Sequence, residues 1–268
     1  MNVLLRIIIA TLFASLGSPV LPALGYEALA RASVITPATS HRRKTAPARK
    51  KTAARPKQKS TQKKSRLTVG EIREAEQRLY DLGYWGGPVD GVFDPKSRQA
   101  LIAFEKVEGL ARGGKLTRQE LEALRSAKRP KPRQGGPFHV EVDLTRQVLF
   151  VVDESGVVSK VLPVSTGNNE LFTSEDWTRR ACTPTGTFRI YRKLPGWRKS
   201  PLGMMYCPNY FVGGVAIHGS PSVPVKAASH GCIRIPMYAA EEFSAMIPIG
   251  TPLIVHSPPQ PCHDWDTE

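Results

Sequence analysis

Residues 31–66 contain no Asp or Glu, although 13 of them are Lys or Arg. Most of the others are small or polar, so this segment cannot bury enough apolar area to offset the entropy cost of folding. Without it, the basic residues of the chain fall from 38 to 25, against 23 acidic residues. The formal net charge of +15 therefore belongs to a segment predicted to be disordered. The nearly neutral remainder argues against a nucleic-acid-binding fold.

Long apolar runs are also scarce. Only residues 7–16 form one, and Arg6 precedes it. Such a run is short for a transmembrane helix, which needs about 20 apolar residues, but it is typical of a secretory signal peptide. We expect residues 1–25 to be a signal peptide, with Ala28 and Ala30 offering a second cleavage site. The alternative is an uncleaved membrane anchor, and under either interpretation the body of the protein is exported.

Export changes the interpretation of the predicted basic linker, which spans residues 26–66. The predicted export signal argues against DNA as the partner of this basic linker. Two interpretations stay open: a solvated linker with weak charge attraction, or specific binding of an anionic lipid or wall polymer.

Cysteine is rare, with four residues in the chain: Cys182, Cys207, Cys232 and Cys262. Outside the cytoplasm cysteines tend to pair. If one of the four is a catalytic thiol, three remain, and three cannot all pair within the chain. Cys182 could pair with Cys207, or either of them with Cys262, and the sequence does not choose.

Residues 67–127 have the spacing of short helices. Thr68 with Glu71, and Thr117 with Glu120, are spaced as capping boxes. A third helix start is expected at Asp94-Pro95, because proline suits the first helical turn. Apolar residues follow each start at helical spacing, so we predict a small bundle of three helices.

The segment between the first two predicted helices reads Leu-Gly-Tyr-Trp at 82–85 and Asp-Gly-Val-Phe at 90–93. With its flanking helices it resembles the peptidoglycan-binding module that accompanies many wall enzymes, over residues 67–126. The resemblance implies wall binding, or packing against a partner domain. Asp94 and Glu105 replace the usual Gly and Gln, which we expect to weaken glycan binding without disturbing the fold.

A linker at 128–136 precedes a different pattern. Residues 138–144 alternate apolar and polar side chains, which predicts a half-buried strand, and residues 147–153 predict a more apolar one. We expect a mostly-β, sandwich-like domain over residues 137–257, then a tail at 258–268. Further strands are expected at 157–164, 186–191, 204–211, 215–218 and 253–256, with a helix after Pro236.

Two motifs carry the candidate chemistry: Ile217-His218-Gly219-Ser220 and Ser229-His230-Gly231-Cys232-Ile233-Arg234. A thiolate is a nucleophile, and an ordinary thiol has a pKa near about 8.5, so Cys232 needs a base such as His218. Gly231 would allow a tight backbone with free N–H groups, which can form an oxyanion hole. Arg234 would lower the pKa of the thiol or hold a substrate carboxylate.

Two alternatives compete with a thiol nucleophile. The cysteine and histidine could be structural, since most such pairs are. They could also bind zinc, through His218, His230 and Cys232. No fourth ligand stands at the usual spacing for zinc, however, and His230 and Cys232 are separated by one residue.

A His-Gly pair 14 residues before the cysteine of Ser-His-Gly-Cys-apolar-Arg closely resembles the L,D-transpeptidase catalytic domain. Matching segments occur at 164–167, 183–188 and 200–203, and the resemblance covers about residues 137–256. It implies that Cys232 attacks the amide carbonyl of the third, meso-diaminopimelyl-type residue of a tetrapeptide stem, whose side chain carries an amine and a carboxylate, and that the terminal D-Ala leaves. An amine of another stem would then resolve the thioester into a 3→3 cross-link.

The same resemblance implies roles for the neighbouring residues. His218 would be the general base and later the acid. His230 and Gly231 would shape the oxyanion hole, and Ser229 and Arg234 would order the loop. Substrate contacts are expected from Tyr210 and Ser220. No metal or organic cofactor is implied, and carbapenem-type β-lactams are expected to acylate the cysteine.

Three other functions stay open. An L,D-carboxypeptidase would use the same thioester with water as the acceptor. A wall-binding structural protein would leave Cys232 silent. Attachment of a surface protein to peptidoglycan would differ only in the acceptor amine.

Overall fold

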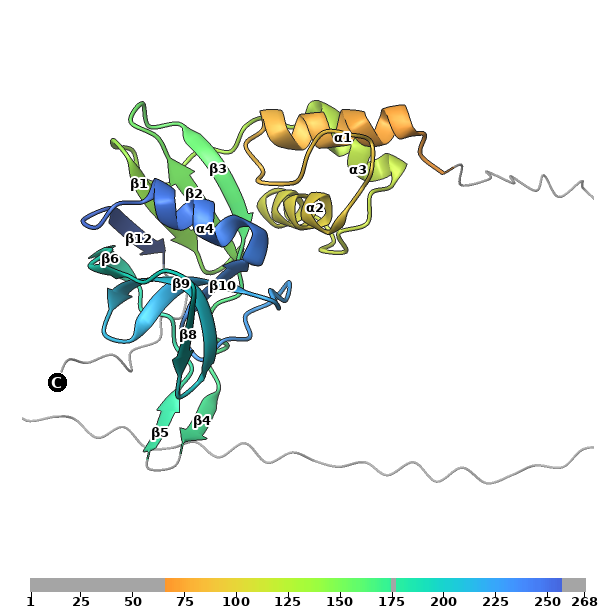
Figure 1. The fold of residues 1–268 in the computed structure, drawn as a ribbon. Coiled ribbons are helices and arrows are strands. Elements are labelled where there is room, and N and C mark those ends of the chain that lie inside the picture. The colour runs from red at the N-terminus through yellow and green to blue at the C-terminus, as the bar shows by residue number, and fades with distance from the viewer. Residues whose placement is uncertain (1–65, 175–176, 257–268) are drawn as a thin grey trace, which may run out of the picture. The chain divides into compact units, whose positions relative to one another are not determined.

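The computed structural model describes residues 66–174 and 177–256 (Figure 1). The predicted signal peptide at 1–25, nearly all of the basic linker at 26–66 and the tail at 258–268 lie outside the described residues. Across the described part of the chain, no helix has both the length and the apolar character to cross a membrane. These residues form an N-terminal helical region and a mostly-β domain, as predicted.

The helical region contains α1 (Val69–Asp81), α2 (Pro95–Glu108) and α3 (Arg118–Ser126). The capping boxes predicted at Thr68 and Thr117 are confirmed, because each threonine exchanges hydrogen bonds with the glutamate three residues later. Asp94 caps α2 by accepting a hydrogen bond of 2.7 Å from the Ser97 N–H. Gly109 ends α2 in the left-handed conformation, with a φ of 68°. The predicted helix starts are therefore set by local capping.

Two buried glutamates hold the loops of this region. Glu76 accepts hydrogen bonds from the Gly91 N–H (2.8 Å) and the Ser97 hydroxyl (3.1 Å), which fixes the turn between α1 and α2. Glu105 accepts from the Gly114 N–H at 2.8 and 3.0 Å, so the residue that departs from the resembled module has a structural partner. Buried carboxylates are stable only when they are hydrogen-bonded in this way.

The described β domain contains two five-stranded sheets. The first has the order β3 (Val158–Pro163), β2 (Val148–Val152), β1 (His139–Asp143), β12 (Pro252–His256) and β6 (Gly186–Arg189). The second has the order β11 (Ile233–Pro236), β10 (Val215–Ser220), β9 (Gly203–Val212) and β7 (Arg192–Lys193), with β8 (Trp197–Ser200) paired to β9. A separate hairpin of β4 (Leu171–Ser174) and β5 (Trp177–Arg180) extends from the domain, and α4 (Met237–Met246) follows β11 (Figure 1).

One hydrophobic core joins the two sheets and α4. It includes Val140 and Leu253 from the first sheet, Ile217 and Ile233 from the second, and Phe243 from α4, all fully buried. Burial of a side chain of this size contributes about 1.5–3 kcal/mol. The core therefore fixes β10 and β11, the two strands that carry the candidate motifs.

The helical region covers the outer face of β2 and β3. Phe150 and Val161 pack there with Tyr84 and Phe104 in a second core. The Trp85 N–H also donates a hydrogen bond of 3.0 Å to the Val161 carbonyl oxygen. Because both of its faces are covered, β2 is apolar throughout, as its sequence indicates.

The prediction for β1 is wrong in one respect. We expected a half-buried strand, but all five of its residues are buried. The Glu141 carboxylate accepts hydrogen bonds from the N–H groups of Arg133 (2.9 Å) and Gln134 (2.7 Å), and the His139 ring nitrogen lies 3.2 Å from it. The segment preceding β1 thus covers its polar face and replaces solvent as the hydrogen-bond partner.

The structure reduces the number of possible disulfide pairings. Cys207 is buried and free, which rules out a pair with Cys182. Cys182 takes part in a disulfide. Cys262 lies outside the described residues.

A buried lysine joins the helical region to the β domain. Lys106 of α2 is 1% exposed, and its Nζ donates to the carbonyl oxygens of Gln147 (3.0 Å) and Val164 (2.9 Å). Burial lowers the pKa of this amine to about 7. No acidic partner offsets that cost within the described residues, so the contact rests on two backbone acceptors.

Replacing Lys106 should change how stability depends on pH. In the unfolded chain the amine has a pKa of about 10.4, so between pH 7 and 10 the unfolded state holds a proton that the folded state lacks. The free energy of unfolding should therefore rise with pH, by at most about 1.4 kcal/mol per unit. Lys106→Met should remove this slope in urea denaturation at pH 7, 8 and 9. The exposed Lys115→Met variant should keep it, and a wild-type slope in Lys106→Met would contradict the account.

Candidate active site

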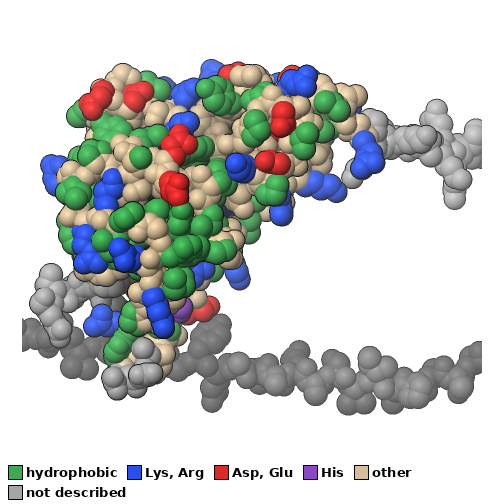
Figure 2. Space-filling view, viewed as in Figure 1, with side chains coloured by type: hydrophobic (Ala, Val, Ile, Leu, Met, Phe, Trp, Pro, Cys, Tyr) green, Lys and Arg blue, Asp and Glu red, His purple; other side chains and the backbone are tan. Residues whose placement is uncertain are grey.

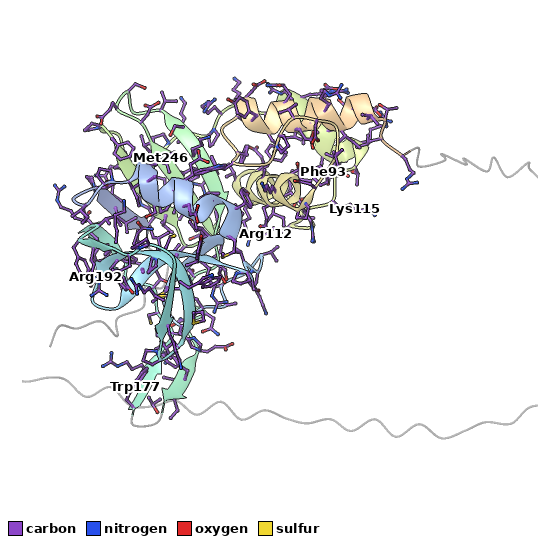
Figure 3. All side chains as sticks on the ribbon, viewed as in Figure 1. Phe93, Arg112, Lys115, Trp177, Arg192 and Met246 are labelled. Carbon is purple, nitrogen blue, oxygen red and sulfur yellow. The ribbon has the colours of Figure 1, made fainter. Side chains whose placement is uncertain are left out.

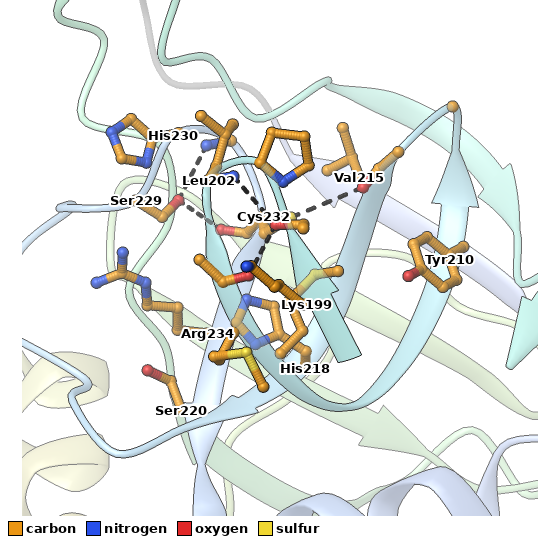
Figure 4. A pocket seen from close by; sticks show the side chains of 18 of the residues that line it. Lys199, Leu202, Tyr210, Val215, His218, Ser220, Ser229, His230, Cys232 and Arg234 are labelled. Carbon is orange, nitrogen blue, oxygen red and sulfur yellow. Dashed lines mark hydrogen bonds between the residues drawn. The ribbon is translucent and has the colours of Figure 1, made fainter. Parts of the chain in front are cut away.

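The register of β10 and β11 brings the two motifs together. The strands are parallel, with Ile217 opposite Ile233 and His218 opposite Arg234. Side chains opposite each other in register share a face, so His218, Arg234 and Cys232 lie on the same side of the sheet. Both His218 and Cys232 line one cavity of about 700 Å³, and Figure 4 shows the cysteine at its centre.

The loop before β11 is held by a segment that the sequence singled out only as a matching motif. Ser165 exchanges backbone hydrogen bonds with Arg234, at 3.0 and 3.1 Å. The Thr166 carbonyl oxygen accepts from the N–H groups of Ala228 (2.9 Å) and Ser229 (2.8 Å). Residues 165–166 thus pair like a short strand with the chain around Cys232. They hold the loop of residues 221–232, here called the cysteine loop, in place.

Thr183 was not predicted as a site residue, yet its side chain holds this loop through hydrogen bonds. Its buried hydroxyl donates to the Gly231 carbonyl oxygen at 2.7 Å and accepts from the Gly167 N–H at 2.9 Å. One hydroxyl therefore ties the loop to two segments. The sequence signal was present, because Thr183 begins a matching motif, but its partner 48 residues away could not be inferred.

Ser229 and Gly231 shape the turn just before the cysteine. The Ser229 hydroxyl donates to the Cys232 carbonyl oxygen (2.6 Å) and accepts from the Gly231 N–H (3.1 Å). Gly231 has a φ of 138°, a conformation that favours glycine. The Gly231 N–H is therefore engaged by the Ser229 hydroxyl. No hydrogen bond in the described part of the chain uses the N–H of His230 or Cys232.

His218 is held as a neutral imidazole. Its Nδ1 lies 2.9 Å from the Gly219 carbonyl oxygen, which can only accept, so Nδ1 carries the proton and Nε2 is left as a base. Burial lowers the pKa of His218 to about 4, and the charge of Arg234 acts in the same direction. A Cβ at Gly219 would lie 2.7 Å from the Ala240 Cβ, so only glycine fits after this histidine.

Burial also raises the pKa of the Cys232 thiol, while an Ala216 backbone hydrogen bond and Arg234 oppose that rise. Its Sγ lies 4.0 Å from the Gly214 carbonyl oxygen. None of the hydrogen bonds between described residues joins Sγ to His218. The resting pair is thus a neutral thiol and a neutral imidazole rather than an ion pair.

The other predicted site residues are distributed around the cavity. Tyr210 is 8% exposed and packs in a small cluster against which Cys232 rests. The Ser220 hydroxyl donates to the Ser222 carbonyl oxygen at 3.0 Å. Both line the cavity, and in Figure 4 Tyr210 and Arg234 lie on opposite sides of the cysteine.

The zinc alternative is not supported by the positions of its ligands. The exposed His230 ring packs against Phe172 of the β4–β5 hairpin, with 4.6 Å between ring centroids. Among residues 66–174 and 177–256, no three or more His, Cys, Asp or Glu side chains are grouped so that they could hold a metal ion. His218, His230 and Cys232 therefore do not form a joint site.

Comparisons with known proteins give two family matches: the L,D-transpeptidase catalytic domain over residues 137–255, and a peptidoglycan binding domain over residues 68–124. No match is found among curated proteins. A solved L,D-transpeptidase from Xylanimonas cellulosilytica is 39% identical, with 69% of this chain and 93% of that chain covered and a TM-score of 0.66. One from Stackebrandtia nassauensis is 22% identical, covering 69% and 90% with a TM-score of 0.40. One from Mycobacterium smegmatis is 24% identical, covering 46% and 60% with a TM-score of 0.36.

Thr183→Val should loosen the cysteine loop while the domain stays folded. Loss of two buried hydrogen bonds costs about 1–3 kcal/mol, so amides of residues 228–232 should exchange hydrogen about tenfold faster or more. Hydrogen-exchange mass spectrometry measures this, with exposed Thr187→Val as the matched control. Unchanged protection of the loop in Thr183→Val would show that Thr183 does not hold it.

The His218 imidazole should remain neutral at pH values where an ordinary histidine gains a proton. With a pKa of about 4 rather than about 6.5, its Cε1 proton resonance should not shift between pH 7.5 and 5.5. NMR titration checks this, and His218→Gln identifies the resonance. A midpoint near 6.5 would contradict the proposed effect of burial.

Proposed function

Because the chain belongs to the L,D-transpeptidase family, we propose that it cross-links peptidoglycan stem peptides through a thioester on Cys232. The observation that carries the proposal is the shared cavity, in which one thiol and one neutral histidine meet on paired strands. A tetrapeptide stem would be the acyl donor, and its third residue would provide the attacked carbonyl.

In the first half-reaction, the Cys232 sulfur attacks that carbonyl carbon while Nε2 of His218 takes the thiol proton. Both groups start neutral, so the transfer creates an imidazolium and a tetrahedral oxyanion together. The imidazolium then gives its proton to the nitrogen of the terminal D-Ala. That amine leaves, and a thioester to the sulfur remains.

The oxyanion needs donors that are not already engaged. The backbone N–H groups of His230 and Cys232 are the candidates, since Ser229 holds the Gly231 N–H. In other enzymes one such donor is worth about 3–4 kcal/mol. Ser229, Thr183 and Gly231 act as positioning residues, because their hydrogen bonds set the direction of this backbone.

In the second half-reaction, the side-chain amine of another stem attacks the thioester. His218 accepts the proton of that amine, and the cysteine sulfur leaves and regains a proton. The product is a 3→3 cross-link. Water in place of the amine would give a tripeptide, which is the carboxypeptidase outcome.

We assign the helical region a role in holding the enzyme on its substrate. It matches a peptidoglycan binding domain, and it packs on β2 and β3 rather than on a flexible tether. Lys106 bonds to the Val164 carbonyl oxygen, one residue before the segment that templates the cysteine loop. The region that we propose to bind the wall therefore contacts the segment that holds the cysteine loop.

Cys232→Ala should abolish both cross-linking and acylation by a carbapenem, since Cys232 is the cysteine among the described residues that line the cavity. The measurement is chromatography with mass spectrometry of products formed from a disaccharide-tetrapeptide. Cys207→Ala is the matched control, because Cys207 is a free thiol buried outside the cavity lining, and it should retain activity.

A 3→3 dimer from the wild type supports the transpeptidase function, whereas a tripeptide alone would assign carboxypeptidase activity. Cross-linking that persists in Cys232→Ala would contradict the mechanism. Absence of any product from folded wild-type protein would favour a binding or structural role.

A further inference from the structure

The cavity around Cys232 is lined by cations from several separate strands. They include Arg179 of β5, Arg192 of β7, Lys199 of β8 and Arg234 of β11. Of the residues described in the structure, no Asp or Glu lines the cavity. Figure 2 shows Lys and Arg side chains interspersed with hydrophobic ones over the part of the visible face where Figure 1 draws β8 and the β4–β5 hairpin. Such a cavity attracts anionic groups and repels cationic ones.

Arg192 is the lining cation that stacks on Tyr210. It is paired in register with Tyr210, and its guanidinium lies 4.7 Å from the centre of the Tyr210 ring. Tyr210 is buried and packs in the cluster that contacts Cys232. The Arg192 charge thus stacks on a buried aromatic ring of the cluster that Cys232 contacts, and Figure 3 shows Arg192 on the flank of the β domain.

No carboxylate among residues 66–174 and 177–256 forms an ion pair with Arg192. The carboxylates that form ion pairs with arginine in the described residues do so with Arg118, Arg125, Arg133 and Arg146. Arg192 is exposed and contributes to none of these pairs. Its five donors remain directed to solvent or to a ligand, and a guanidinium matches a carboxylate with two parallel hydrogen bonds.

The other lining cations suit this role less well. Arg180 donates a hydrogen bond of 2.9 Å to the Asn169 carbonyl oxygen, so its guanidinium is partly engaged. Arg234 lies opposite His218 and acts on the reacting pair, so its charge is used in the chemistry. Arg179 stacks on Trp177 of the projecting hairpin, at 5.1 Å, and Lys199 is an exposed side chain without the planar fork of arginine.

We propose that Arg192, supported by Tyr210, is a specificity-determining residue that binds a free carboxylate of the stem peptide. The identity of this ligand rests on the proposed function. Stems in which the carboxylate on the side chain of the third residue is replaced by a carboxamide lose the charge that Arg192 recognises. The enzyme therefore favours non-amidated stems over amidated ones.

The test measures binding without turnover, in the full-length chain with Cys232→Ala. Isothermal titration calorimetry would compare a disaccharide-tetrapeptide bearing the free carboxylate with its otherwise identical carboxamide. The free acid should bind about tenfold more tightly, as expected for one charge-assisted hydrogen-bonded pair at an exposed site. Adding Arg192→Gln should reduce the preference to within about twofold. Arg198→Gln, an exposed arginine of β8 outside the cavity lining, should keep it.

Equal binding of the two ligands, tighter binding of the carboxamide, or a preference that survives Arg192→Gln would each overturn the proposal. No measurable binding of either ligand to folded protein would also overturn it. Turnover by the wild-type enzyme is scored separately. Cross-linking of both stems alike would leave the proposed function standing while this inference fails. A preference for the free carboxylate without cross-linking would leave this inference standing while the proposed function fails.

Discussion

The cysteine loop depends on hydrogen bonds that come from outside it. Residues 221–232 contain no regular helix or strand, and their last turn is fixed by Ser165, Thr166 and Thr183. Those residues are held in turn by the two-sheet core. The backbone that presents Cys232 is therefore positioned by distant parts of the fold in addition to the local hydrogen bonds of Ser229, as a reaction sensitive to small displacements requires.

Burial explains the protonation states of His218 and Cys232 in the resting enzyme. The same desolvation lowers the pKa of His218 and raises that of Cys232, so it disfavours both charged forms. Arg234 acts on both groups, favouring the thiolate and opposing the imidazolium. The resting site is consequently neutral in its reacting pair but cationic at its walls.

The sequence was informative where structure is local or where a motif is specific. The capping boxes at Thr68 and Thr117 specified helix starts, and the two motifs around His218 and Cys232 meet on paired strands. It was less informative where partners are distant in the chain. The polar face of β1 looked solvated because Arg133 and Gln134, which cover it, gave no periodic signal. Strands β4, β5, β7 and β8 are short and lie at the surface. They form because β9 supplies hydrogen bonds to β7 and β8, and because β4 and β5 pair with each other. The burial of Lys106 could not be predicted, since nothing local indicates that its acceptors lie in another domain.

The measurement that tests the central claim most directly is the location of the acyl group on the enzyme. Wild-type protein would be mixed with a disaccharide-tetrapeptide, quenched in acid and digested for peptide mapping by mass spectrometry. The account predicts a mass gain equal to the donor without its terminal D-Ala, on the peptide that contains Cys232 and sensitive to hydroxylamine as a thioester should be. A stable adduct at any other residue, or product formation with Cys232 blocked, would contradict it.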